Sequence, residues 1–153
     1  MTVGARFPGV EARSLAGERF AVPDELPGRL RLLAVAFRRE QQAQVDSWLD
    51  WLLDLEARGD GLSVFELPVL SVVFAPARRL IDGGMARGVG TDAARARTLT
   101  VYGDVRGVVR ALGLAGTDTI ALVLVDRSGT ILAQELGGFD ESAARRLEGA
   151  IDG

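Results

Sequence analysis

Residues 30–42 read LRLLAVAFRREQQ, and no other segment constrains the architecture as much. From Leu30 to Phe37 the chain is almost continuously apolar, with turn-forming residues before it and polar residues after it. Such a run is typical of a strand that is covered on both faces inside a parallel sheet. We therefore expect the central strand of the fold here, followed by a helix.

A helical pattern occupies residues 41–58, directly after this strand. Asp46, Asp50 and Asp54 lie on one flank, and Arg58 is spaced to pair with Asp54. Glycines in the segment 59–61 are expected to end the helix. The apolar residues recur at helical spacing and form one stripe on the opposite flank, made of Val45, Trp48, Leu49, Leu52, Leu53 and Leu55.

The rest of the chain alternates between strand and helix patterns. Gly17 lies between two short strand-like segments and predicts an N-terminal hairpin. In order, the patterns predict strands at 10–14 and 19–22, a strand at 62–73, a short helix from Pro76 with the apolar face Leu80, Ile81 and Met85, a loop or turn at 91–93, a strand at 98–102, a helix at 105–112, a hairpin of strands at 119–125 and 130–134, and a helix at 141–151.

This order predicts an α/β fold, because strands that alternate with helices pair in parallel, while the late hairpin adds antiparallel strands. We expect a three-layer sandwich, in which a mixed β-sheet has helices on both faces. The length fits a single domain over residues 1–153, with the N-terminal hairpin at about 10–22 and the core at about 30–151.

Composition limits the chemistry that the chain can perform. It has no cysteine, no histidine and no lysine, so its own side chains offer no thiolate, imidazole or amine. Arginines and acidic residues are interleaved, and the net charge of −3 gives no basic field to hold a nucleic acid. No apolar run suits a membrane span. We expect a cytoplasmic protein without nucleic-acid partner or membrane insertion.

Three stretches resemble the thioredoxin-like superfamily in its peroxiredoxin (alkyl hydroperoxide reductase) branch. Residues 31–37 resemble the strand before the active site, and 111–114 resemble the end of a short helix before the later hairpin. Residues 124–131, LVDRSGTI, resemble the signature in which a strand is followed by Asp, two residues, Gly and a further strand. The resemblance covers nearly the whole chain and implies a thioredoxin-like fold.

The functional residues of those families are missing. Residues 37–45 contain neither the Pro-x-x-x-Thr-x-x-Cys run of peroxiredoxins nor Cys-x-x-Cys, and residues 117–119, TDT, stand where thioredoxins place a cis-proline. Peroxide reduction and disulfide exchange need a thiolate, so both are excluded for this cysteine-less chain. A looser similarity to the thioredoxin-like ATP synthase assembly factor implies that such a scaffold can serve in assembly without redox chemistry.

The candidate site is the strand-to-helix junction, because loops at the carboxyl ends of parallel strands face the binding crevice and helix starts attract anions. Two arginines there could hold a carboxylate or phosphate, or contact a partner protein. The alternative is a solvated loop whose arginines pair with nearby acids. The candidate residues are Phe37, Arg38, Arg39, Glu40, Gln41 and Gln42.

Trp51 lies outside the apolar stripe by the helical period, so it could anchor a partner or a dimer, or pack against an adjacent loop. The aspartates of the helix flank are expected to be solvated rather than to bind a metal. The glycines at 83–84 and 88–90 match no nucleotide-binding pattern and are expected to weaken the helix. With no histidine or cysteine, we expect no metal and no cofactor.

Two main functions remain open at this stage. The first is a non-redox domain for protein binding or assembly, with a protein partner or a homodimer. The second is a binder, or thiol-independent enzyme, for a small anionic ligand at 37–42, with Glu40 or Asp104 as carboxylate base. A redox enzyme that borrows a thiol from glutathione or a partner is a third.

Overall fold

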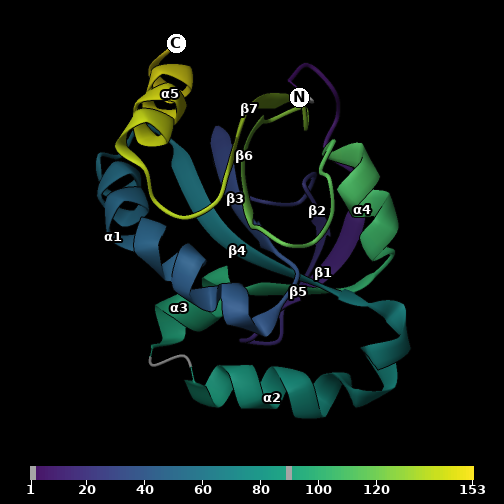
Figure 1. Ribbon diagram of the computed structural model, residues 1–153. Coiled ribbons are helices and arrows are strands. Elements are labelled where there is room, and N and C mark those ends of the chain that lie inside the picture. Colours follow the sequence, from purple (N-terminus) through teal and green to yellow (C-terminus); the bar gives the residue numbers. More distant parts are fainter. Residues whose placement is uncertain (1–2, 89–90) are drawn as a thin grey trace.

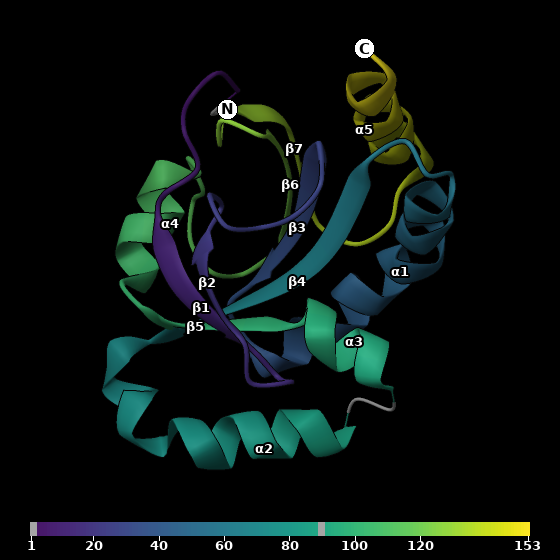
Figure 2. The same ribbon diagram turned by 180° about the vertical axis from the view of Figure 1, so that it is seen from behind.

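The computed structural model describes residues 3–88 and 91–153 and has a mixed sheet between helices (Figure 1). The helices α1 and α5 cover one side of the sheet and α4 covers the other (Figures 1 and 2). The strands are β1 (Val10–Ser14), β2 (Arg19–Val22), β3 (Leu30–Ala36), β4 (Leu62–Ser71), β5 (Leu99–Gly103), β6 (Ala121–Asp126) and β7 (Ile131–Leu136). The helices are the 3-10 helices η1 (Arg39–Gln41) and η2 (Val72–Ala77), and α1 (Gln42–Ala57), α2 (Arg78–Gly88), α3 (Asp92–Arg97), α4 (Val105–Ala111) and α5 (Glu141–Asp152).

The seven strands are ordered β2-β1-β5-β4-β3-β6-β7. All residues of β3 are buried between its parallel partner β4 and its antiparallel partner β6, which confirms the predicted central strand. β5 is parallel to β4, while the hairpins β1–β2 and β6–β7 add antiparallel strands at the two edges. The mixed α/β sandwich expected from the sequence is therefore confirmed.

Alternate residues of β3 enter two separate cores. Leu33 and Val35 join the core on the α4 side, whereas Leu32 and Ala34 join the core beneath α1 and α5. Burying one large apolar side chain contributes about 1.5–3 kcal/mol. Because both faces of β3 contribute in this way, its sequence is apolar at almost every position.

Arg31 is the exception in this strand, since its side chain is fully buried. Its Nη1 donates to the carbonyl of Leu26 (3.2 Å) and its Nη2 to the carbonyl of Pro23 (3.0 Å). Burial lowers the pKa of the Arg31 guanidinium. The side chain thus fixes the segment before β3 to the strand through backbone carbonyls.

The helix predicted at 41–58 is present as η1 followed by α1. Four residues of the predicted stripe, Val45, Trp48, Leu52 and Leu55, are buried against the sheet, whereas Leu49 and Leu53 are only half-buried and lie outside both cores. The expected pair between Arg58 and Asp54 is wrong, because Arg58 Nη2 instead contacts Oε2 of Glu148 in α5. The carboxylate of the neighbouring helix lies within reach, so this contact joins the end of α1 to α5.

The strand predicted at 62–73 ends earlier, at Ser71. The Ser71 hydroxyl accepts a hydrogen bond from the Val73 amide (3.3 Å), and the chain turns there into η2. Pro76 lies inside η2 rather than at the start of the following helix, which begins at Arg78. A side-chain cap at the strand end therefore converts the last predicted strand residues into a helical turn.

Residues 91–93 were expected as a loop or single turn, but they begin helix α3. The Thr91 hydroxyl accepts from the amide of Ala94 (3.1 Å), and this cap allows a short helix to form. α2 continues through Gly83 and Gly84, so these glycines do not interrupt it. The remaining residues expected to weaken the helix, at 89–90, lie outside the described residues.

Candidate functional site

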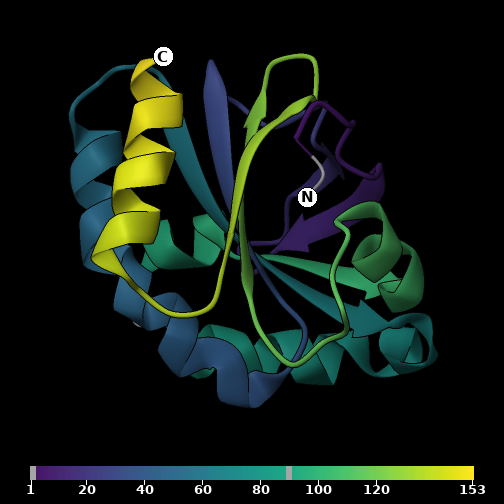
Figure 3. The same ribbon diagram turned by 45° about the horizontal axis from the view of Figure 1, so that its top comes forward.

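The junction, defined as residues 37–42, connects the end of β3 to the start of α1. In three views the start of α1 lies beside α2 (Figures 1, 2 and 3). Phe37 and Gln41 are buried, whereas Arg38, Arg39 and Glu40 are exposed. The junction therefore contains both buried residues that contact the interior and charged residues that are exposed to solvent.

Gln41 holds the junction together from inside. Its Oε1 accepts from the amides of Phe37 (2.8 Å) and Arg38 (3.1 Å), and its Nε2 donates to the carbonyl of Thr117 (2.6 Å). Amides that follow a strand end need such partners when they are buried. Gln41 thus has a positioning role, which ties the junction to the loop before β6.

Arg38 is already paired within the chain. Its Nη2 lies 2.9 Å from Oδ1 of Asp118, and its Nε and Nη2 donate to the Thr117 hydroxyl (3.3 and 3.0 Å). The TDT segment that stands at the cis-proline position therefore lies against the junction. The Asp118 carboxylate offsets the positive charge of Arg38 that a small anion would need. Of the two arginines expected to hold an anion, only Arg39 is therefore without an ion pair in the described structure.

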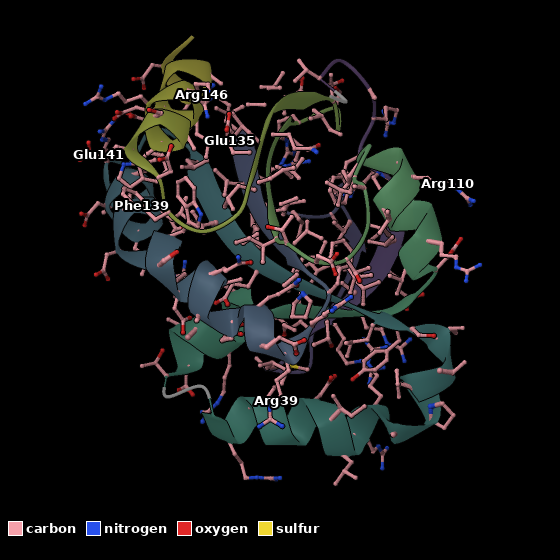
Figure 4. All side chains as sticks on the ribbon, viewed as in Figure 1. Arg39, Arg110, Glu135, Phe139, Glu141 and Arg146 are labelled. Atoms are coloured by element: carbon pink, nitrogen blue, oxygen red, sulfur yellow. The ribbon has the colours of Figure 1, made fainter. Side chains whose placement is uncertain are left out.

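Arg39 and Glu40 are exposed and have no ion-pair partner in the part of the chain that the structure describes. Figure 4 shows the Arg39 side chain extending from the start of α1 toward α2. These two residues give the junction a charged outer surface that the fold itself does not use.

Gln42 bridges two carboxylates at the other side of the junction. Its Nε2 donates to Oδ1 of Asp46 (2.9 Å) and to Oε1 of Glu66 (3.2 Å). Glu66 lies on β4 and is 9% exposed, and burial raises the pKa of its carboxyl. Glu66 was not among the candidate residues expected from the sequence. A lone acidic residue inside such a run is the signal that could have marked it.

Trp51 belongs to an aromatic cluster with Trp48 and Phe139, and it packs against the core beneath α1 and α5. Its ring is edge-on to that of Trp48 (5.5 Å between centroids) and to that of Phe139 (6.4 Å). Trp48 Nε1 donates to the carbonyl of Gly137 (2.9 Å), which fixes the loop that carries Phe139. Trp51 is half-buried, and Phe139 is the more exposed ring of the cluster. The structure does not bring Trp51 together with the charged residues of the junction.

Exposed large apolar side chains lie on η2 and α2, the second of which is beside the start of α1 (Figures 1, 2 and 3). Val72, Val73, Phe74 and Leu80 are 50–76% exposed. The expectation that Leu80 shares an apolar face with Ile81 and Met85 is wrong, since the latter two are half-buried while Leu80 points to solvent. Sequence reasoning missed this surface, although three consecutive large apolar residues after a strand end are a visible signal.

The other candidates have structural roles or stay separate. Asp104, the alternative base, accepts from the Gly107 amide (3.0 Å) and caps α4. The aspartates at 46, 50 and 54 are exposed, and among the described residues no group of acidic side chains is arranged to hold a metal ion. Two hollows of about 300 and 440 Å³ are lined by residues 9–25 and by residues near Arg29 and Arg127. Neither is lined by residues of the junction.

No protein-family model and no curated protein matches the chain. It is similar in structure to a thiol:disulfide interchange protein from Bacteroides sp., with 19% identity, a TM-score of 0.66, and coverage of 100% of this chain and 92% of that one. It is similar to the thioredoxin domain of a thiol-disulfide oxidoreductase from Bacteroides vulgatus, with 19% identity, a TM-score of 0.57 and 99% of both chains covered. It is also similar to BsSco, a member of the Sco family of cytochrome c oxidase assembly proteins, with 11% identity, a TM-score of 0.60, and 96% and 94% coverage.

These likenesses, together with the sheet order and the helices on both faces, define the class of fold. The chain has a thioredoxin-like α/β fold, as the resemblance of its sequence implied. It carries this fold without any cysteine. Over residues 3–88 and 91–153, no helix has both the length and the apolar character needed to cross a membrane.

Proposed function

We propose that this chain is a non-redox thioredoxin-like domain that binds another protein through its junction. The observation that carries the proposal is the internal bonding of that segment. Gln41 and Arg38 are bonded to the Thr117–Asp118 loop, while Arg39 and Glu40 project outward without partners among the described residues. A preorganised surface with unused charged groups suits protein recognition, because little ordering free energy is lost on binding.

The small-anion alternative has weaker support. Arg38 faces Asp118, and neither of the two hollows described above is lined by junction residues. A small ligand needs a concave site that surrounds most of its surface, whereas a protein partner needs only a complementary face. Protein binding therefore agrees better with an exposed junction.

Other features of the proposal come from resemblance. BsSco is a member of a family of assembly proteins, so a thioredoxin-like fold of this kind occurs in proteins of that class. We include in the proposal an assembly role, a cytoplasmic location and the closer relationship to the peroxiredoxin branch. The proposal includes a homodimer, in which the protein partner is a second copy of this chain bound through the same face.

The test compares two charge reversals in exposed arginines that lack ion pairs in the described structure. Arg39→Glu changes the junction, and Arg110→Glu changes α4 on the opposite side of the sheet (Figure 4). The parent chain and both variants are tagged and expressed in the organism from which the sequence comes. After cross-linking, the proteins that co-purify with each chain are quantified. Light scattering measures self-association, and circular dichroism confirms folding.

We expect a defined partner, or a dimer, that is retained by Arg110→Glu and lost with Arg39→Glu. Identical co-purifying proteins for all three chains, together with strictly monomeric behaviour, would contradict the proposal.

A further inference from the structure

The segment made of η2 and α2 concentrates exposed apolar side chains. Seven large apolar residues of the described structure are exposed, and four of them lie here: Val72, Val73, Phe74 and Leu80. A cluster of this kind on an otherwise polar surface marks an interaction site more often than scattered single residues do.

The inner face of this segment is attached to the sheet by polar contacts. Asp82 accepts from the Thr100 hydroxyl (3.0 Å) and from the Tyr102 hydroxyl (2.8 Å). Arg78 donates to the Thr100 carbonyl (2.9 Å), and its guanidinium lies 4.6 Å from the centre of the Tyr102 ring. No residue from 72 to 87 is fully buried. The fold therefore uses the inner face of α2 and leaves the apolar outer residues unpaired.

The outer face of α2 is also positively charged. By the helical period, Arg87 lies about 20° from Leu80 around the helix, and Arg79 about 100° from it. Both arginines are exposed and have no carboxylate partner among the described residues. The single acid of the segment, Asp82, points inward to Thr100 and Tyr102. Arg39 of the adjacent junction extends the positive charge toward α2 (Figure 4).

We propose that a docking surface made of Val72, Val73, Phe74, Arg79, Leu80 and Arg87 binds an acidic segment of a partner protein that carries apolar side chains between its carboxylates. This inference rests on the proposed protein-binding function and names the chemistry of the partner. Apolar anchors give affinity, and the unpaired arginines select carboxylates around them.

Charge argues against two other occupants. In a two-fold dimer built on this surface, the arginines of one copy would face those of the other. An anionic membrane would meet a chain whose net charge is −3, including the exposed Glu40 beside the surface. A short protein segment, unlike a membrane, contacts only the docking surface and its arginines. An acidic segment is therefore the occupant that the charges favour.

The experiment pans a phage-displayed library of random peptides on the full chain. We expect the enriched peptides to combine Asp or Glu with Leu, Ile or Phe. Binding of the selected peptide is then measured by fluorescence anisotropy. Leu80→Ser and Arg87→Glu should each weaken it by about ten-fold, as expected for loss of an interface contact. Leu136→Ser and Arg110→Glu are matched controls on other exposed sites and should retain the affinity.

Several results would overturn the inference. These are no enriched peptide, enriched peptides without acidic residues, or equal affinity of Leu80→Ser and the controls. Self-association or binding to phosphatidylserine vesicles that is lost with Leu80→Ser would assign the surface to a second copy or to a membrane instead.

The outcome also separates this inference from the proposed function. If partners in cells are lost with Arg39→Glu but kept with Leu80→Ser, the docking surface is wrong and the junction is still the binding site. If the selected peptide requires Leu80 and no cellular partner depends on Arg39, the role proposed for the junction is wrong.

Discussion

Gln41 shows how one buried side chain can join two distant parts of a chain. Its amide spans the junction and the Thr117 carbonyl, which are separated by 76 residues in sequence. Each of its hydrogen bonds satisfies a backbone group that would otherwise lack a partner on burial. The position of Arg39 and Glu40 on the surface depends on this support from below.

We predict that Gln41→Met destabilises the fold by about 1–3 kcal/mol, because it leaves the buried Phe37 amide without a hydrogen-bond partner. Urea unfolding measures the change. Gln44→Met, in the adjoining helix α1, is the matched control, since the Gln44 side-chain oxygen has no hydrogen-bond partner in the described structure. Equal stability of the two variants would show that Gln41 does not support the junction.

Glu66 gives a prediction about pH. Burial raises the pKa of this carboxyl above its ordinary value of 4.5, so the folded state holds the proton more tightly than the unfolded chain does. As pH rises above 4.5, the unfolded chain releases its proton first, and the free energy of unfolding falls. Glu66→Gln removes this loss.

The Glu66→Gln variant should therefore have a higher melting temperature than the parent at pH 7, and the gain should vanish toward pH 4. Glu11→Gln, at an exposed position, is the control for the substitution itself. A gain that is equal at both pH values, or a less stable variant at pH 7, would contradict the account.

At the level of elements, α1 and α2 are attached to the sheet in different ways. α1 buries an apolar stripe that includes Trp48, whereas α2 is joined by Arg78 and Asp82 to polar groups of β5. Burial of apolar area resists local opening more strongly than a few polar contacts do. The two helices should therefore differ in their local stability.

We predict that Trp48→Ala costs about 3–5 kcal/mol in unfolding free energy, because it leaves a large cavity in the core. Trp51→Ala, one turn away and half-buried, should cost about 1–2 kcal/mol. Guanidinium unfolding of both variants checks the difference. Similar costs would mean that Trp51 is as much a core residue as its neighbour.

We predict that Asp82→Ala increases amide exchange in α2 by about 30-fold, since it removes two hydrogen bonds to β5 worth about 1 kcal/mol each. The rest of the described chain should keep its protection in hydrogen-exchange mass spectrometry. Asp50→Ala, which changes an exposed carboxylate in α1, is the control. An increase spread evenly over all elements would show that α2 is part of the global core.

Across the whole molecule, the sequence patterns predicted the elements that are determined by interactions between residues near one another in the sequence. The apolar run at 30–37 and the helical spacing after it predicted β3 and α1, because the residues that form each buried face lie close together in the sequence. The link from Gln41 to Thr117 was not predictable, since it depends on how separate loops meet. Leu80 was assigned to the wrong face because hydropathy alone cannot tell which side of an amphipathic helix meets the sheet.

The junction and the docking surface lie on neighbouring elements, since the start of α1 lies beside α2 and η2 leads directly into α2 (Figures 1, 2 and 3). A partner protein that covers both would contact charged groups of the junction and apolar groups of η2 and α2. We therefore propose that the junction, η2 and α2 together form the protein-binding face of this cysteine-less thioredoxin-like fold.

Native mass spectrometry of the chain, isolated from its own cells at its natural level, tests this claim most directly. We expect a complex heavier than the 16.3 kDa chain, which separates on activation into this chain and a stoichiometric second protein subunit. The complex should be absent for Arg39→Glu and present for Arg110→Glu. A mass of 16.3 kDa in every preparation, whatever the variant, would contradict the account.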